Sequence, residues 1–151
     1  MKVSIYSRQR MEERLKEGAL LTAAVVSFYD PPAQGRTWEE PVDYTGKCDR
    51  VMQIPLWDLD PAALGAKGLT VDTYFPEADA VADFIYKARA EGLSLICQCE
   101  YGQSRSAGCA AAVLEHFARR GIRIFADYRY YPNQLVYHKV KDALDRYRTA
   151  L

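Results

Sequence analysis

The chain has no excess charge of either sign, and it has few histidines. Lysine plus arginine and aspartate plus glutamate both number 20, and only 2 histidines are present. A protein without net charge has no long-range field that draws it onto nucleic acid or an anionic membrane, so we expect neither partner. His116 and His138 are too scattered to indicate a zinc site, even beside the Cys97-x-Cys99 pair. We therefore expect no metal and no other cofactor.

The sequence also lacks a long apolar run. No segment approaches the roughly 18 consecutive apolar residues that a membrane helix needs. The start, Met1–Arg8, lacks the extended apolar stretch of a signal peptide. Three of the four cysteines, Cys97, Cys99 and Cys109, crowd into one segment, which suits reduced thiols better than a disulfide framework. We therefore expect a cytoplasmic protein.

Apolar β-rich runs alternate with segments of helical periodicity. At 151 residues, this alternation predicts a single α/β domain over 1–151, with a central, mostly parallel sheet of about four to five strands flanked by helices. No second composition zone is present, and we expect a monomer. The predicted strands lie near Val3–Tyr6, Ala23–Tyr29, Val51–Leu56 and Leu93–Cys99. Helices are predicted over 8–18, around 81–88, over 104–120 with Gly121 as a left-handed cap, and from Asn133 along a stripe that ends at Leu151; residues 31–41 are a predicted surface loop.

Several reactive or aromatic residues have structural interpretations. Cys97 alternates with its strand neighbours, which is typical of a small core residue, although Cys97 and Cys109 are also candidate resolving thiols for an oxidised Cys99. His116 is expected on the helix surface or at the edge of the core. The late tyrosines are expected to pack against the last helix; they are Tyr128, Tyr130, Tyr131 and Tyr137.

The most informative segment runs from Leu93 to Ser106. An apolar strand leads into Cys99, then into a short loop with one glycine, then into Arg105 and a helix. A loop this tight turns its backbone N–H groups inward, and the helix adds its positive end to the same point. We expect it to bind a phosphate or sulfate ion and to favour the thiolate of Cys99. The predicted anion-binding residues are Glu100, Tyr101, Gly102, Gln103, Ser104 and Arg105; Gly102 provides positive φ or a close approach.

This segment resembles the active-site signature of cysteine-dependent protein tyrosine and dual-specificity phosphatases. In both, a cysteine is followed by five residues, an arginine, and a serine or threonine. The segments Val51–Asp58 and Arg129–Asn133 follow the family's order, and the nearest likeness is to compact dual-specificity phosphatases and small bacterial proteins known as predicted protein tyrosine phosphatases. The resemblance implies their fold, with the Cys-x5-Arg loop between a strand and a helix. It also implies hydrolysis of a phosphomonoester, on a phosphorylated protein or a small phosphorylated metabolite, through a cysteinyl-phosphate intermediate.

The resemblance also implies roles for individual residues. Cys99 is the nucleophile, Arg105 clamps the phosphate, and Ser106 hydrogen-bonds the sulfur as it leaves. A general acid must protonate the departing oxygen, and Asp58 matches the family context, with Asp60 as the alternative. An ionised Cys99 and a protonated acid predict a bell-shaped pH profile on the acid side of neutral.

One departure from the family pattern keeps other functions open. Gln98 stands where the family has a histidine, and a neutral amide brings no positive charge to the sulfur. A catalytically weak phosphate- or phosphoprotein-binding module is therefore an alternative. A sulfurtransferase or arsenate reductase is a further one, although the similar arsenate reductases carry this loop near the N-terminus. The physiological substrate is not specified by the sequence.

Overall fold

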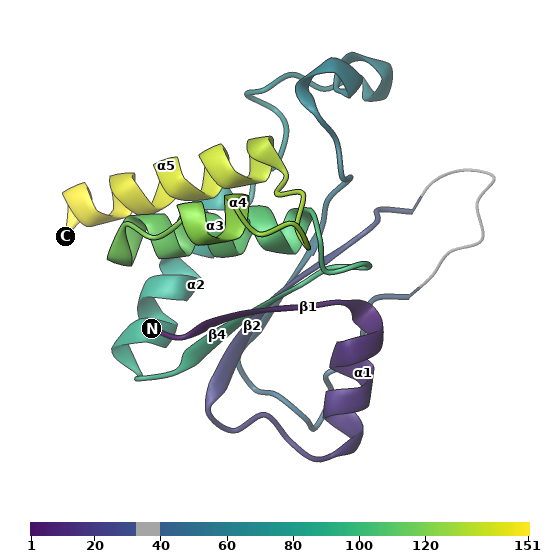
Figure 1. The fold of residues 1–151 in the computed structure, drawn as a ribbon, viewed down its shortest axis with the longest axis vertical. Helices are drawn as coiled ribbons and strands as arrows, with labels where there is room; N and C mark the ends of the chain where they lie inside the picture. Colours follow the sequence, from purple (N-terminus) through teal and green to yellow (C-terminus); the bar gives the residue numbers. More distant parts are fainter. Residues whose placement is uncertain (33–39) are drawn as a thin grey trace.

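The computed structural model describes residues 1–32 and 40–151 and contains a sheet of four parallel strands in the order β1-β4-β2-β3. These strands are β1 (Val3–Tyr6), β2 (Ala23–Tyr29), β3 (Val51–Pro55) and β4 (Ser94–Gln98). Each lies where the sequence predicted it, and the parallel α/β architecture is confirmed (Figure 1). The predicted surface loop over 31–41 falls mostly outside the described residues.

Helices cover both faces of the sheet. The helix α1 (Arg8–Lys16) lies on one face, and α2 (Ala78–Ala90), α3 (Arg105–Ala118) and α5 (Gln134–Ala150) lie on the other (Figure 1). The helix α2 buries Val81, Ile85 and Ala88, the i, i+4, i+7 stripe that its sequence predicted. Short helices fill the connections: η1 (Pro61–Ala63), η2 (Gly65–Lys67) and α4 (Ile122–Phe125), which the sequence analysis missed.

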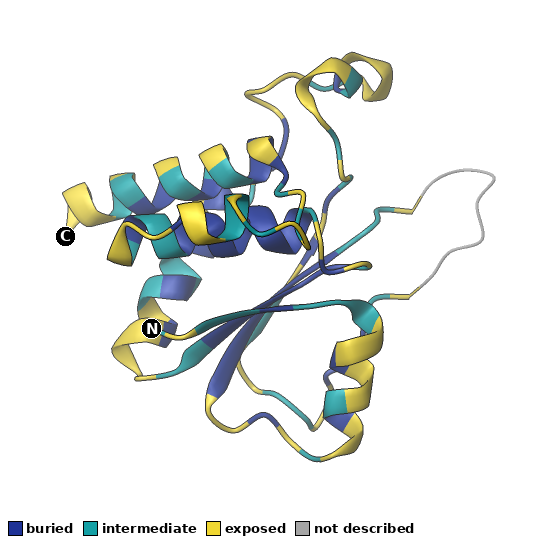
Figure 2. Cartoon of the chain, in the orientation of Figure 1, coloured by how far each residue is buried: buried dark blue, intermediate teal, exposed yellow. Residues whose placement is uncertain are grey.

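The strand β4 contributes to two cores because its side chains alternate between faces. Leu95 and Cys97 belong to the larger core under α2, α3 and α5, while Ile96 belongs to the smaller core beside α1. Figure 2 shows that the buried part of the chain, in dark blue, runs through the middle of the sheet. Leu95 and Cys97 are fully buried at 0% exposure. Burying one aliphatic side chain such as Leu95 contributes about 1.5–3 kcal/mol, so the apolar run Leu95–Cys97 stabilises β4 at the centre of the sheet.

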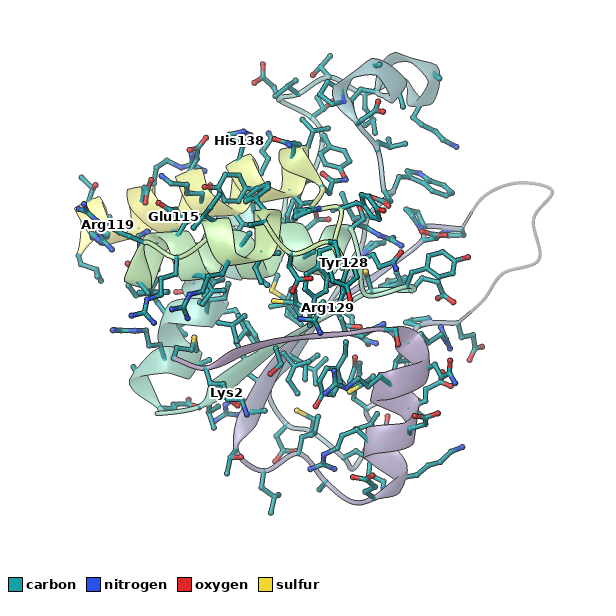
Figure 3. All side chains as sticks on the ribbon, in the orientation of Figure 1. Lys2, Glu115, Arg119, Tyr128, Arg129 and His138 are labelled. Carbon is teal, nitrogen blue, oxygen red and sulfur yellow. The ribbon has the colours of Figure 1, made fainter. Side chains whose placement is uncertain are left out.

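The end of α3 corrects one prediction. Arg119, not Gly121, takes the left-handed conformation, with φ 54°, and it lies at the end of α3 (Figure 3). The N–H groups of Arg119 and Arg120 close the helix by donating to the carbonyls of Glu115 and Leu114. Gly121 is needed for a different reason, because a Cβ there would lie 2.9 Å from the carbonyl oxygen of Ala111.

One prediction about the late tyrosines was also wrong. Tyr128 and Tyr131 do not pack against the last helix, since they lie on a surface loop and are 89% and 74% exposed. Of the two places predicted for His116, the structure shows the edge of the core: its side chain is fully buried, and it hydrogen-bonds Tyr86 and the half-exposed Asp145. Leu151 is exposed beyond the end of α5.

The parallel arrangement places the functional segments together. All four strands end at the same edge of the sheet, and ligand sites in such sheets form beyond the carboxyl ends of the strands. At this edge lie Ser7 after β1, Asp30 after β2, Asp58 after β3 and Cys99 after β4. No described helix is long and apolar enough to cross a membrane.

Candidate active site

Cys99 is the first residue after β4, and its sulfur is held in place. Its backbone N–H donates to the carbonyl of Tyr6 over 3.2 Å, which continues the β1–β4 pairing by one residue. Its Sγ lies 3.0 Å from the hydroxyl oxygen of Ser106 in the first turn of α3. The residue is only 2% exposed. Cys99 and Ser106, predicted to act together, are therefore in direct contact.

The loop after Cys99 turns its carbonyls outward. The carbonyl of Glu100 accepts from the N–H of Arg8, and that of Gln103 accepts from the N–H of Tyr131. The carbonyl of Ser104 accepts from the N–H groups of Gly108 and Asn133. Within the described residues, the backbone N–H groups of residues 100–104 donate to no protein acceptor. This is the arrangement that a loop needs to surround an anion with N–H groups.

Gly102 meets both conditions that the sequence analysis set for it. Its φ is +67°, a conformation that side chains rarely adopt. A Cβ there would also lie 2.6 Å from the backbone nitrogen of Ser7, which caps α1. The loop is therefore packed directly against the junction of β1 and α1.

Arg105 begins α3 and extends below the loop with 4% exposure. Its Nη1 donates to the carbonyl oxygen of Leu56 over 2.7 Å and to Oδ1 of Asp30 over 2.8 Å. Its Nε is buried and has no hydrogen-bond partner among the described residues. A buried N–H without an acceptor is costly, so this edge of the guanidinium suits an anionic ligand.

Asp58 contacts the loop, whereas Asp60 does not. Oδ1 of Asp58 accepts from the hydroxyl of Ser104 over 2.7 Å and from Nδ2 of Asn133 over 2.8 Å. Asp60 instead caps η1, since its Oδ1 accepts from the N–H of Ala63. The geometry favours Asp58 as the acid and gives Asp60 a structural role; the assignment itself stays a prediction.

The sequence analysis missed two residues of this site. Asn133 was predicted only as the start of the last helix, and its Oδ1 does cap α5 through the N–H of Val136. Its Nδ2 also donates to Oδ1 of Asp58 and to the carbonyl of Leu59, so one amide joins α5 to the segment that contains the candidate acid. Asp30, the ion-pair partner of Arg105, could have been found from its position directly after a central parallel strand.

The segment before Asp58 is also braced. The hydroxyl of Tyr74 donates to the carbonyl of Trp57 over 2.6 Å. Burial raises the pKa of Tyr74 to about 12, so this hydroxyl keeps its proton at any ordinary pH. A hollow of about 280 Å³ lies beside Asp58, and its wall includes Ser104 and the exposed Tyr131.

The remaining candidate residues lie at the periphery or in the core. Tyr101 is 78% exposed on the loop. Cys97 and Cys109 are fully buried, and the hydrogen bond that the Cys97 thiol donates to Cys109, together with burial, holds the pKa of Cys97 well above its ordinary value. A thiol of this kind reacts slowly, so the resolving role of Cys97 is not favoured. Nowhere in the described chain do three or more metal-ligating side chains gather.

Comparison with known proteins supports the fold. No protein-family model and no curated protein matches the chain. Among solved structures, human DUSP28 is 17% identical, with a TM-score of 0.55 over 97% of this chain and 90% of that one. Tk-PTP in its active form is 14% identical, with a TM-score of 0.56 over 97% and 93%. PTPMT1 in complex with PI(5)P is 16% identical, with a TM-score of 0.54 over 99% and 94%. The chain therefore has the fold of the protein tyrosine and dual-specificity phosphatases, with Cys99 and Arg105 at the two ends of the loop between β4 and α3.

Proposed function

We propose that the protein is a cysteine-dependent phosphomonoester hydrolase. The observation that carries this proposal is the convergence of three features on one loop. The sulfur of Cys99 contacts the hydroxyl of Ser106, the N–H groups of residues 100–104 have no protein acceptor in the described chain, and Nε of Arg105 is buried without a partner. These groups together fit the oxygens of a phosphate whose phosphorus faces the sulfur.

In the first step, the thiolate of Cys99 attacks phosphorus and forms a P–S bond. The P–O bond to the substrate's alcohol breaks, and Asp58 transfers its proton to the departing oxygen. One oxygen of Asp58 is held by Ser104 and Asn133, which leaves Oδ2 to carry that proton. The loop N–H groups and Arg105 stabilise the charge that spreads over the phosphoryl oxygens.

In the second step, water attacks the same phosphorus. Asp58, now a carboxylate, takes a proton from the water, and the P–S bond breaks to release phosphate. The hydroxyl of Ser106 donates to the departing sulfur from 3.0 Å, which stabilises the returning thiolate.

The substrate class is a phosphomonoester, either on a protein or on a small phosphorylated metabolite. Two of the similar structures carry the names DUSP28 and Tk-PTP, and a third, PTPMT1, was solved with PI(5)P. These names support phosphoproteins and phosphorylated small molecules alike. All four cysteines are unpaired, which is compatible with the cytoplasmic location proposed from the sequence.

Hydrolysis of p-nitrophenyl phosphate across pH tests the proposal. Cys99→Ser is expected to lose about 10³-fold or more in kcat. Cys48→Ser removes a thiol that bonds the carbonyls of Ala23 and Arg50, away from the loop, and is expected to leave the rate unchanged. Asp58→Asn is expected to lose about 10²–10⁴-fold, and Asp60→Asn far less. Equal rates for the wild type and Cys99→Ser would end the proposal.

A second candidate is a phosphate-binding module with little turnover, and Gln98 is the residue that favours it. In that case the wild type binds a phosphopeptide tightly and releases no phosphate. Turnover of thiosulfate or arsenate without phosphatase activity would instead indicate a sulfurtransferase or an arsenate reductase.

A further inference from the structure

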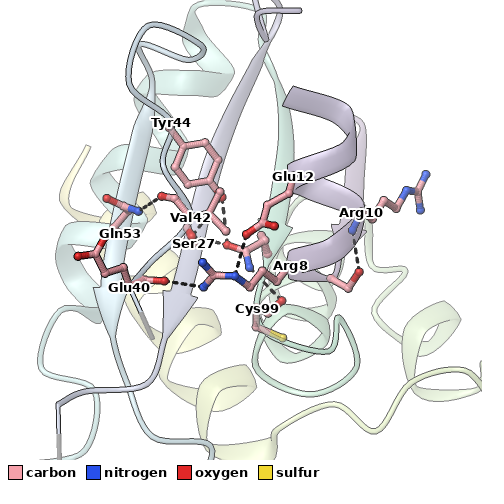
Figure 4. A network of polar contacts seen from close by, with 11 residues as sticks. Arg8, Arg10, Glu12, Ser27, Glu40, Val42, Tyr44, Gln53 and Cys99 are labelled. Atoms are coloured by element: carbon pink, nitrogen blue, oxygen red, sulfur yellow. Dashed lines mark hydrogen bonds and ion pairs between the residues drawn. The ribbon is translucent and has the colours of Figure 1, made fainter. Parts of the chain in front are cut away.

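Three polar side chains meet behind Cys99, on the face of the sheet opposite its sulfur. They are Gln98, Ser27 and Tyr44, with exposures of 2%, 1% and 6%. Ser27 and Gln98 are paired in the β2–β4 register. Tyr44 belongs to the connection between β2 and β3, and its side chain meets them on the face of the sheet that α1 covers (Figure 4). The catalytic steps above use none of the three.

The orientation of the Gln98 amide is fixed by its partners. Its nitrogen Nε2 lies 2.9 Å from the carbonyl oxygen of Cys99, which can only accept. Its oxygen Oε1 therefore faces the hydroxyls of Ser27 and Tyr44, and both are within hydrogen-bond distance. The Tyr44 hydroxyl also lies 3.1 Å from the Ser27 oxygen. Every polar atom in this group has a partner, so the amide has one favoured orientation.

Both backbone polar groups of Cys99 are hydrogen-bonded. The N–H of Cys99 donates to Tyr6, and its carbonyl accepts from Gln98. The carbonyl belongs to the peptide unit whose N–H is that of Glu100, the first N–H of the anion-binding loop. Holding the carbonyl therefore sets the direction of that N–H.

We propose that Gln98 is a positioning residue that orients the Cys99–Glu100 peptide, and that Ser27 and Tyr44 hold its amide in place. This inference rests on the proposed function and deepens it. A neutral amide clamp occupies the position where the resembled family has a histidine.

The segment that precedes Tyr44 is itself anchored at two points. Nε2 of Gln53 donates to the carbonyl of Val42 over 2.8 Å, and Nη1 of Arg8 donates to the carbonyl of Glu40 over 2.6 Å (Figure 4). The Tyr44 ring packs in the smaller core. A hydroxyl on a fixed ring can hold the amide at little further cost in entropy.

The clamp keeps its protons over the working range of pH. Burial raises the pKa of Tyr44 far above its ordinary value, so its hydroxyl stays a donor. Serine and the amide do not titrate. The arrangement therefore supplies orientation without a change of charge, unlike a histidine.

Steady-state hydrolysis of p-nitrophenyl phosphate by single and double variants tests the clamp. Gln98→Met keeps the length of the side chain and removes the donor, and we expect kcat to fall about 10- to 100-fold. Tyr44→Phe removes one hydroxyl, and we expect a loss of about fivefold. Because Tyr44 acts through Gln98, the double variant should be no slower than Gln98→Met alone.

Tyr86→Phe is the matched control. Tyr86 is another partly buried tyrosine whose hydroxyl bonds a side chain, the Nε2 of His116, but it lies between helices away from the loop. A similar loss of stability is expected in Tyr44→Phe and Tyr86→Phe, with kcat reduced only in Tyr44→Phe. Equal kcat values in the two variants and the wild type would overturn the proposal.

Gln98→Glu gives a pH signature that a purely structural role does not produce. An ionised carboxylate cannot donate to the Cys99 carbonyl, whereas a protonated one can. Of the titratable groups near position 98, Tyr44 and Cys99 contact Gln98 and Tyr6 is its register partner on β1. Arg8 and Cys48 act electrostatically on Tyr44. We expect the loss in kcat relative to the wild type to deepen from about pH 5 to about pH 8, and a pH-independent loss would contradict the clamp.

The outcomes separate this inference from the proposed function. If the wild type hydrolyses the substrate and Cys99→Ser does not, while Gln98→Met and Tyr44→Phe match the wild type, only the clamp is wrong. If Cys99→Ser matches the wild type, the proposed function is wrong first.

Discussion

Two buried polar networks of this molecule differ in whether they contain a group that ordinarily titrates near neutral pH. The clamp behind Cys99 consists of an amide and two hydroxyls. The network between α2, α3 and α5 is centred on His116, whose Nδ1 lies 2.7 Å from Asp145 and whose Nε2 lies 2.6 Å from the hydroxyl of Tyr86. Arg148 also donates to the carbonyl of His116. The first network borders the candidate active site, and the second joins helices.

The difference indicates that pH acts on separate properties through separate regions. Burial lowers the pKa of His116, and the hydrogen bond that Nδ1 of His116 donates to Asp145 opposes this shift in part. Protonation of His116 at low pH is therefore expected to lower the free energy of unfolding through the contacts between α2, α3 and α5. The clamp offers no comparable group, so the pH dependence of activity is expected to come from the reacting residues themselves.

The largest expected effect tests the rigidity of the loop region. Gly102→Ala places a Cβ 2.6 Å from the backbone of Ser7 at a φ of +67°, and neither can relax cheaply. We expect a loss of about 2 kcal/mol or more in the free energy of unfolding, and at least about 100-fold in kcat. Urea unfolding and p-nitrophenyl phosphate hydrolysis measure the two.

Gly92→Ala is the control for that variant. Gly92 has a similar φ of +76° but nothing lies within 4 Å of an added Cβ, and it precedes β4 at the far end of the strand. We expect only the backbone strain of a side chain at positive φ, which should lower the free energy of unfolding by about 1–2 kcal/mol and leave kcat unchanged. Full activity in Gly102→Ala would show that the loop is not packed as described.

The next effect tests the helix network. His116→Gln removes hydrogen bonds in a buried group, and we expect a loss of about 2–4 kcal/mol in the free energy of unfolding at neutral pH. The kcat of the folded protein should not change. A large fall in kcat for this variant would mean that the two networks are coupled.

The same variant tests the sign of the pH dependence. Because the folded pKa of His116 lies below its unfolded value of about 6.5, the unfolded chain binds the proton first as pH falls. Stability contributed by neutral His116 is present above that value and is lost as pH falls below it, until the folded pKa is passed. Urea unfolding from pH 7.5 to pH 5 should therefore show a steeper loss in the wild type than in His116→Gln; parallel curves would reject this explanation.

A smaller effect separates the two roles of Asn133. Asn133→Ser keeps a good helix cap but loses the donor to Asp58, so we expect kcat to fall a few-fold with little change in stability. Asn133→Ala loses both roles and should also cost about 1 kcal/mol. If the serine variant keeps full activity, Asn133 serves α5 and does not position the acid.

The smallest effect is expected at the surface. Arg146 pairs with Asp79 between α5 and α2, but both side chains are well exposed, at 61% and 73%. Arg146→Ala should change the free energy of unfolding by less than about 0.5–1 kcal/mol. A larger loss would mean that the helix junction depends on more than the His116 network.

Local patterns were sufficient to predict the strands, the main helices and the loop. The strand before Cys99 has the apolar run Leu95–Cys97 because β4 is central and buried on both faces. The cap at Asn133 and the conformation of Gly102 also follow from chemistry within a few residues. In each case the structure depends on contacts within a few residues or on the spacing of apolar residues along the segment.

The rest depends on contacts that no local pattern contains. Ser27 and Tyr44 lie 71 and 54 positions from Gln98 and meet it only because β2 and β4 are neighbours. His116 is buried because α2 and α5 close over it, although its place near the end of α3 resembles a surface position. Arg119 is the left-handed cap because α3 ends at Ala118, and Gly121 instead packs closely against α3.

The most direct test of the central claim is to trap the covalent intermediate on Cys99. Asp58→Asn is mixed with p-nitrophenyl phosphate, whose leaving group needs little acid assistance, quenched in acid within the first turnover, digested and examined by mass spectrometry. The account predicts that the peptide containing Cys99 gains one phosphoryl group, and that the same peptide of Cys99→Ser does not. Release of phosphate by the wild type with no adduct on this peptide, and at an equal rate by Cys99→Ser, would contradict it.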